Sequence, residues 1–148
     1  MSVGRRRQYA TFVLDGLLFG IEVGRVREAL RHQPLTPVPL TGGAIGGLLN
    51  LRGEIVTAFD LRWRLELPAR PPDQRPMNLV VRTDDGVLSL LVDEISDVVD
   101  VDEDRFELRP ETLTGEARDL IRGTFQAGQR LMLVLDLDRA LAAPGVLR

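Results

Sequence analysis

Residues 50–62 constrain the fold of this 148-residue chain more than any other stretch. They read N-L-R-G-E-I-V-T-A-F-D-L-R, in which an apolar run from Ile55 to Phe59 follows an Arg-Gly pair and ends at a polar tripeptide. A short run of apolar and β-branched residues predicts a buried strand, and the glycine before it predicts a tight turn. Such a turn would hold Arg52 at a fixed place beside the strand.

Arg52 has two interpretations from the sequence. A surface arginine that pairs with a nearby acid adds little to stability. A planar guanidinium presented by a rigid turn also suits recognition of a carboxylate on another protein. The second interpretation makes the turn a candidate interaction site.

Turn residues divide the rest of the chain into short segments of strand character. An Asp-Gly pair between two apolar runs predicts a hairpin, and this arrangement occurs at Asp15-Gly16 and at Asp85-Gly86. Between 24 and 31 the apolar residues recur at helical spacing, which predicts one or two turns of helix. The expected strands cover 9–14, 17–22, 35–40, 55–59, 79–82, 87–92, 95–101, 120–126 and 130–136, and a short helix is expected over 137–142.

Strands of this length, spaced roughly eight to twelve residues apart, are typical of small barrels or a sandwich. We therefore predict an all-β protein with one or two short helices. Leu61 to Leu65 is expected to form a brief turn. The proline-rich stretch from Leu67 to Pro76 is the expected loop between two halves of the chain.

Composition excludes several classes of protein. The net charge of −3 argues against non-specific nucleic-acid binding, which requires a basic surface. No apolar run approaches the roughly 18–20 residues of a membrane-spanning helix. The chain has no cysteine, so it has no disulfide framework, which is compatible with the cytosol. Seven carboxylates lie between Asp93 and Asp104 without an intervening base, leaving the remainder of the chain positively charged.

Two stretches resemble ligand-binding loops only in part. The glycines of 42–47 have the spacing of a phosphate-binding loop, but Leu48-Leu49 stands where the lysine and hydroxyl are needed. Asp100 to Asp104 repeats the spacing of a calcium loop, but Arg105 occupies the position that requires glycine. We expect a structural corner at the glycines and an exposed acidic strand edge that discourages edge-to-edge pairing.

Catalytic motifs are absent from the sequence. The one histidine, His32, lies in an Arg- and Pro-rich stretch with no nucleophile or metal ligand at motif spacing. No nucleophile elbow, zinc-binding helix or kinase motif occurs. We expect a protein that is not an enzyme and uses no metal or cofactor.

The string at 50–62 resembles the signature of CheW-like coupling proteins, the adaptors that join bacterial chemoreceptors to the histidine kinase CheA. Other segments between Tyr9 and Leu141 resemble that family in the same order. Several matches in register are more specific than the first string alone. They are Phe19-Gly20-Ile21 with Val26-Arg27-Glu28, then Thr36-Pro37-Val38-Pro39, Gly46 to Gly53, Leu91 to Val98, and Arg122-Gly123 with Leu131 to Asp136.

The resemblance implies one CheW-like domain over 1–148, folded as two five-stranded SH3-like β-barrels side by side with a groove between them. The first barrel would cover about 15–75 and the second about 76–148. The strand over 8–14 is a candidate member of the second barrel.

The resemblance also implies two protein partners, the regulatory domain of a CheA-type kinase and the cytoplasmic tip of chemoreceptors. It implies a cytoplasmic location at receptor arrays, a monomer in isolation, no nucleic acid and no direct membrane insertion. Receptor binding would involve Glu28, Arg52, Gly47, Gly53, Ile95 and Val98. Kinase binding would involve Val23, Val26, Pro110, Thr112 and Leu113. Thr112 or Leu113 replaces an aromatic residue that the family often has, which weakens the expectation of ring closure in receptor arrays.

The leading functional hypothesis is a non-catalytic adaptor in bacterial chemotaxis signal transduction. A coupling protein of a non-motility chemosensory pathway would share this biochemistry and differ in its partners. A small-ligand-binding β-barrel is the alternative from another class, and a thermal shift with nucleotides would support it.

Overall fold

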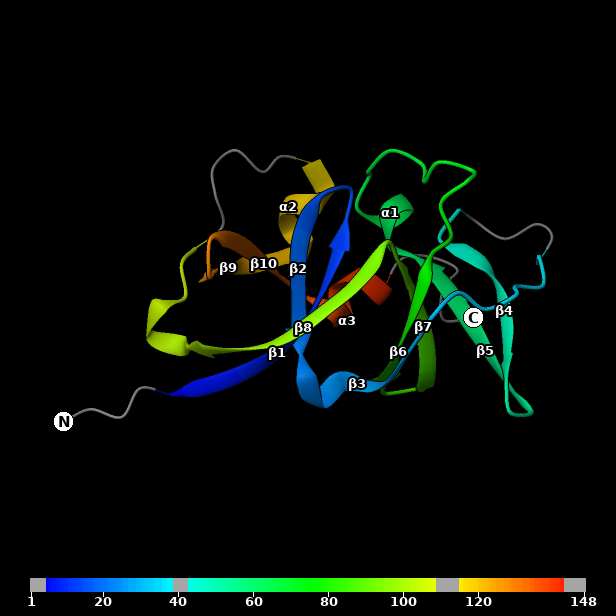
Figure 1. Cartoon of the computed structure of the whole chain (residues 1–148), viewed down its shortest axis with the longest axis horizontal. Coiled ribbons are helices and arrows are strands. Elements are labelled where there is room, and N and C mark those ends of the chain that lie inside the picture. The colour runs from blue at the N-terminus through cyan, green and yellow to red at the C-terminus, as the bar shows by residue number, and fades with distance from the viewer. Residues whose placement is uncertain (1–4, 39–42, 109–114, 143–148) are drawn as a thin grey trace.

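The computed structural model of the chain describes residues 5–38, 43–108 and 115–142. Ten strands and three short α-helices make up these parts (Figure 1). The strands are β1 (Arg6–Leu14), β2 (Leu17–Glu22), β3 (Val26–Leu30), β4 (Ile45–Leu51), β5 (Glu54–Asp60), β6 (Met77–Thr83), β7 (Gly86–Val92), β8 (Glu94–Asp102), β9 (Ile121–Ala127) and β10 (Arg130–Leu135). The helices are α1 (Leu61–Arg64), α2 (Gly115–Leu120) and α3 (Leu137–Leu141), with 3-10 turns η1 (Val23–Arg25) and η2 (Glu103–Arg105).

The strands form two five-stranded sheets that lie side by side (Figure 1). Sheet A has the order β8-β1-β2-β10-β9 and sheet B the order β3-β6-β7-β5-β4. The prediction of a mainly β protein with two five-stranded units and a few short helices is confirmed. No helix in the described parts of the chain is long and apolar enough to cross a membrane.

Both sheets follow the same plan. Each strand of sheet B has a counterpart in sheet A: β3 corresponds to β8, β4 to β9, β5 to β10, β6 to β1 and β7 to β2. With this correspondence the two sheets have the same strand order. Each sheet contains one parallel pair, β5 with β7 and β10 with β2. A short helix follows β5 and β10, and each helix begins at an aspartate, Asp60 or Asp136, whose carboxylate accepts backbone N–H bonds. The sequence pattern D-L-x-x-x-L at 60–65 and 136–141 is the local repeat behind this correspondence.

The sheets divide the chain differently from the expected boundary between 75 and 76. Sheet B takes its strands from 26–92, and sheet A combines 6–22 with 94–135. The chain crosses between sheets at η1 and again at Asp93. The proline-rich stretch before β6 is a loop, but it connects parts of one sheet. Long-range pairing of β1 and β2 with β8 and β10 sets this division, and no local composition reports it.

One core cluster spans both sheets. It includes Phe12 and Phe19 of sheet A and Phe59 and Leu90 of sheet B, all nearly inaccessible to solvent. Helices α1 and α3 contribute Leu61 and other apolar residues to the same cluster. The two sheets are therefore packed into one body, because separating them would expose this shared apolar surface to water.

The helix predicted over 24–31 is wrong. Only Val23–Arg25 forms a 3-10 turn, and Val26–Leu30 is strand β3, paired with β6. Its side chains alternate between half-buried and exposed, which is the two-residue period of a strand. Pairing with β6 has overridden the helical spacing of a few apolar residues.

The signature strand is confirmed as β5, but its burial begins one residue later than expected. Ile55 is 63% exposed, and Val56 is the first buried side chain. The residues after it form α1, not the expected turn. The other expected strands are present within three residues of their ends, except the segment over 35–40. There Thr36 makes an isolated bridge to Leu48, and residues 39–42 lie outside the described parts of the chain.

Candidate protein-interaction site

The turn between β4 and β5 holds Arg52 in an uncommon backbone conformation. Arg52 and Gly53 have φ angles of 52° and 91°, the combination that defines the two-residue type I′ hairpin turn. The Asn50 side chain accepts a hydrogen bond from the Gly53 N–H at 2.8 Å and closes the turn. A positive φ is unfavourable for a residue with a Cβ, and Asn is the residue usually found at this position. An arginine held in such a place is a candidate for a functional role.

Arg52 forms an exposed ion pair with Glu28 of β3. Its Nη2 donates to Glu28 Oε2 at 2.6 Å, although the two residues lie 24 positions apart in the chain. The Arg52 side chain remains 64% exposed, so the guanidinium is accessible to a second protein. The hydrogen bond from Arg52 lowers the pKa of Glu28 most strongly, and the same bond raises the pKa of Arg52. Both groups are therefore charged at neutral pH.

Arg27 extends this pair into a chain of four alternating charges. Its Nη1 donates to Glu54 Oε1 at 2.9 Å, and its Nε lies 3.6 Å from Glu28 Oε2. The order Glu54–Arg27–Glu28–Arg52 joins β3 to both ends of the hairpin turn. Fixed charges of alternating sign favour one orientation of a complementary partner over others.

Gly47 and Gly53 lie on the same hairpin as Arg52, for different physical reasons. Gly53 completes the turn and has open space around it. Gly47 has φ 146°, and a Cβ built on it would lie 2.9 Å from the Thr36 carbonyl oxygen. This close approach allows Thr36 and Leu48 to exchange two backbone hydrogen bonds of 2.8 and 2.9 Å. Gly47 therefore has a packing role in addition to the expected interaction role.

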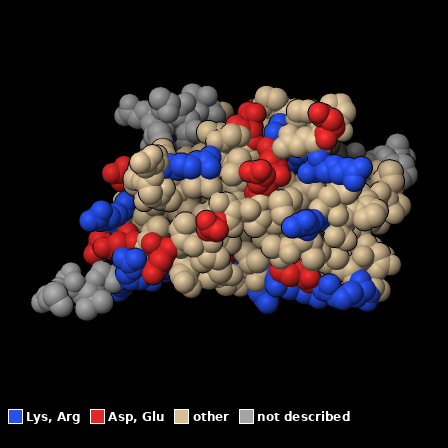
Figure 2. All heavy atoms as spheres, viewed as in Figure 1, with Lys and Arg blue, Asp and Glu red and all other residues tan. Residues whose placement is uncertain are grey.

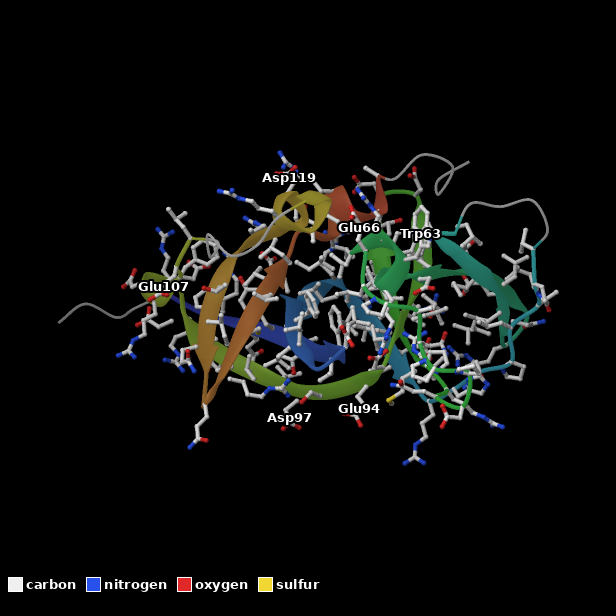
Figure 3. All side chains as sticks on the ribbon, turned by 90° about the horizontal axis from the view of Figure 1, so that it is seen from above. Trp63, Glu66, Glu94, Asp97, Glu107 and Asp119 are labelled. Atoms are coloured by element: carbon white, nitrogen blue, oxygen red, sulfur yellow. The ribbon has the colours of Figure 1, made fainter. Side chains whose placement is uncertain are left out.

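The remaining expected receptor positions, Ile95 and Val98, lie on β8 of sheet A. Ile95 is partly buried against the core, whereas Val98 is 52% exposed. Figure 3 shows the neighbouring Glu94 and Asp97 pointing outward from β8, on the opposite side of the molecule from Trp63. Glu28, Arg52, Gly47 and Gly53 are thus gathered at one hairpin, while Ile95 and Val98 belong to a separate strand of the other sheet.

The expected kinase-binding positions are described only in part. Val23 lies in η1 and Val26 begins β3, and both are half-buried. Val26 pairs with Val81 and packs against the shared core. Pro110, Thr112 and Leu113 lie outside the described residues.

A buried ionic network surrounds Asp93, and no motif in the sequence predicted it. The Asp93 carboxylate accepts hydrogen bonds from Arg62, Arg70 and the Asp15 backbone N–H, at 2.5 to 3.0 Å. The side chains of Arg62 and Asp93 are each only 6% exposed. Arg70 Nη2 also lies 3.0 Å from Asp93 Oδ1, without hydrogen-bond geometry. The arginine of the D-L-R tripeptide is therefore structural, whereas Arg52 at the turn is exposed.

Arginines of β1 partly neutralise the acidic stretch. Arg6 lies 3.4 Å from Asp100, and Arg7 lies 2.5 Å from Glu103. Basic and acidic side chains are interspersed over the face in Figure 2, including the end of the molecule near the N-terminus. The acidic stretch therefore lies on β8 beside β1, and arginines of β1 form ion pairs with two of its carboxylates.

The described barrel interiors are filled by side chains. Three clusters of buried apolar residues occupy them. A hollow of about 730 Å³ lies instead at the outer end of sheet A, bordered by Arg6, Arg105 and several acids. Its mixture of both charges on an open surface differs from the enclosed, mainly apolar pocket that a small ligand usually occupies.

Comparison with known proteins shows which family this chain resembles. The CheW-like domain family matches residues 8–144. The chemotaxis protein CheW of Treponema pallidum is 26% identical over 140 residues, which cover 92% of this chain and 82% of that protein. The chemotaxis protein CheW of Bacillus subtilis is 29% identical over 130 residues, which cover 88% and 83%.

A solved structure has the same fold. The crystal structure of the scaffolding protein TtCheW from Thermoanaerobacter tengcongensis is similar with a TM-score of 0.84. The match covers 97% of this chain and 98% of that chain, at 23% sequence identity. The arrangement of the two five-stranded units is therefore shared over nearly the whole length of both chains.

Proposed function

Because the chain belongs to the CheW-like domain family, we propose that it is a non-catalytic adaptor coupling chemoreceptors to a CheA-type histidine kinase. It acts in the cytoplasm, at membrane-associated receptor arrays, and binds the kinase regulatory domain and the cytoplasmic tip of the receptor. The names of its relatives support a role in chemotaxis, and the similarity in fold to the scaffolding protein TtCheW supports a scaffold.

The observation that carries the proposal is the exposed arginine at the type I′ turn. Arg52 is held by its hydrogen bond to Glu28, and its side chain remains 64% exposed. A guanidinium in this position can donate to a carboxylate or to the carbonyl groups of a receptor helix. In this proposal receptor binding involves Glu28, Arg52, Gly47, Gly53, Ile95 and Val98.

The kinase interface is apolar in this proposal. It involves Val23 and Val26, together with Pro110, Thr112 and Leu113 outside the described residues. Apolar contacts supply affinity, and the charged pair at the hairpin fixes the register of the receptor. The adaptor couples its partners if binding at one interface changes the free energy of binding or activation at the other.

The test is receptor control of the kinase in reconstituted assemblies of receptor, kinase and this protein. We expect Arg52→Ala and Arg52→Asn to abolish receptor control while leaving the fold and kinase-domain binding intact. Arg6→Ala removes an exposed arginine of sheet A that also pairs with an acid, and serves as the matched control. If the receptor still controls the kinase in assemblies that contain the Arg52→Ala variant, the proposal is contradicted.

A coupling protein of a non-motility pathway would use the same surfaces with other partners. A pull-down from cell extract, analysed for a histidine kinase and a methyl-accepting receptor, separates these pathways by the kinase it retrieves. Retrieval of neither class of protein would contradict both versions of the adaptor.

A further inference from the structure

We propose that Arg27 is a positioning residue, which holds Glu28 in place for Arg52 and links this pair to the apolar segment at Val23 and Val26. The proposed partners rest on the function proposed above. The positioning role requires no partner, because it depends on contacts within this chain.

A β-bulge brings Arg27 and Glu28 to the same hairpin. Val26 pairs with Val81 and Glu28 pairs with the next residue of β6, Val80, so Arg27 is the extra residue of the strand. Consecutive side chains of a regular strand point to opposite faces, and a bulge redirects them. Here Arg27 reaches Glu54 at 2.9 Å while Glu28 reaches Arg52 at 2.6 Å.

Arg27 lies close to two carboxylates, Glu28 and Glu54, and forms an ion pair with each. Its Nη1 binds Glu54, and its Nε lies 3.6 Å from Glu28 Oε2. The Arg27 side chain is 32% exposed, half the exposed fraction of the Arg52 side chain, so Arg52 is the more accessible of the two guanidinium groups. This arrangement fixes the acid that orients Arg52 and leaves Arg52 itself available to a partner.

The segment just before the bulge is anchored to a different part of the molecule. Arg25 donates to Asp138 of α3 at 2.8 Å and to the Arg82 carbonyl oxygen at 3.1 Å. Arg82 in turn donates to the Val26 carbonyl oxygen at 2.6 Å. The chain before the bulge is thus tied to α3 and β6, whereas Arg27 and Glu28 reach the turn between β4 and β5. Arg27 lies between the proposed kinase contacts and the proposed receptor contacts.

The experiment compares Arg27→Gln with Arg6→Gln, which removes an exposed arginine from sheet A. NMR titration of the Glu28 carboxyl carbon measures the local effect without any partner. We expect the pKa of Glu28 to rise in Arg27→Gln and to stay unchanged in Arg6→Gln. We also expect Arg27→Gln to weaken binding of a receptor-tip fragment by about threefold, the scale of one exposed ion pair.

A second measurement tests the link between interfaces. The affinity of the kinase regulatory domain is measured with and without a saturating receptor fragment. We expect Arg27→Gln to leave the affinity of the kinase domain alone unchanged and to move the ratio of the two affinities toward one. A variant that merely loosened the fold would weaken kinase binding by itself.

The outcomes distinguish this inference from the proposed function. An unchanged pKa of Glu28 in Arg27→Gln would overturn the positioning role, whatever the partners do. A raised pKa with unchanged receptor affinity and an unchanged affinity ratio would overturn the link to recognition. If the wild-type protein binds neither partner, the adaptor proposal fails, and the titration still decides whether Arg27 positions Glu28.

Discussion

Arg62 and Asp93 form a two-point ion pair at the place where the chain crosses from sheet B to sheet A. Arg62 Nε donates to Asp93 Oδ1 at 2.9 Å, and Nη2 donates to Oδ2 at 2.5 Å. Arg62 also donates to the Pro68 carbonyl oxygen, and the Asp15 N–H donates to Asp93. One buried carboxylate therefore fastens α1 and the proline-rich loop to the β1–β2 turn.

Removing the Asp93 charge should destabilise the protein strongly. Asp93→Asn leaves the buried Arg62 and the partly buried Arg70 without a counter-charge, and breaking a buried pair in this way costs about 3–5 kcal/mol. Asp138→Asn breaks an exposed pair with Arg25 and should change the free energy of unfolding by less than about 1 kcal/mol. Urea denaturation of both variants measures the difference. Similar losses in the two variants would contradict a special role for the buried pair.

The same carboxylate should make stability depend on acid pH. Burial alone raises the pKa of Asp93, but hydrogen bonds from Arg62, Asp15 and Arg70 outweigh burial and leave the pKa below its ordinary value. A depressed folded-state pKa gives stability that is present above the unfolded value of about 4 and is lost as the pH falls through the folded value. The stability difference between wild type and Asp93→Asn should therefore shrink below about pH 4. A difference that stays constant from pH 7 to pH 3 would rule out this linkage.

Substitutions of Arg52 should separate folding from recognition. Asn tolerates the positive φ at this position, so Arg52→Asn should keep the melting temperature of the wild type. A β-branched residue is strongly disfavoured there, and Arg52→Val should lower the melting temperature by roughly 3–6 °C. Calorimetry of the two variants checks the order. Equal melting temperatures would show that the turn does not impose its conformation on this residue.

Gly47 should resist even the smallest side chain. Gly47→Ala combines an unfavourable φ with a Cβ placed 2.9 Å from the Thr36 carbonyl oxygen, and should cost about 1–3 kcal/mol. Gly24→Ala is the control, because a Cβ there meets no atom within 4 Å. Chemical denaturation measures both. A receptor-binding defect in Gly47→Ala would have to be corrected for this loss of stability before it is assigned to a contact.

The sequence predicted best those elements whose geometry is decided locally. Asp15-Gly16 and Asp85-Gly86 mark hairpins that form with the expected strands. The Arg-Gly pair at the signature turn was expected to present Arg52 at the surface, and the residue is exposed there. Turn chemistry acts over two to four residues, so a short stretch of sequence contains all that it needs.

Features that depend on distant partners could not be predicted in the same way. Strand β3 is a strand because β6 lies beside it, some fifty positions away in the chain. The partner of Arg62 is 31 residues distant, and nothing near either residue reports the other. The repeated D-L-x-x-x-L pattern at 60–65 and 136–141 was the available signal that the chain contains two similar units. It would also have pointed to two capped helices in place of a turn and a helix.

The way the chain is shared between its sheets has a consequence for synthesis. Sheet B comes from one contiguous stretch, 26–92, whereas the hairpin of β1 and β2 pairs with β8 and β10, which are translated after sheet B. A nascent chain can complete sheet B on the ribosome while that first hairpin still lacks its neighbours. The hairpin can pack its phenylalanines against sheet B at that stage, but its backbone lacks both neighbouring strands until β8 and β10 have been translated. A chain that stops before β10 therefore leaves sheet A incomplete, with β2 missing its parallel neighbour.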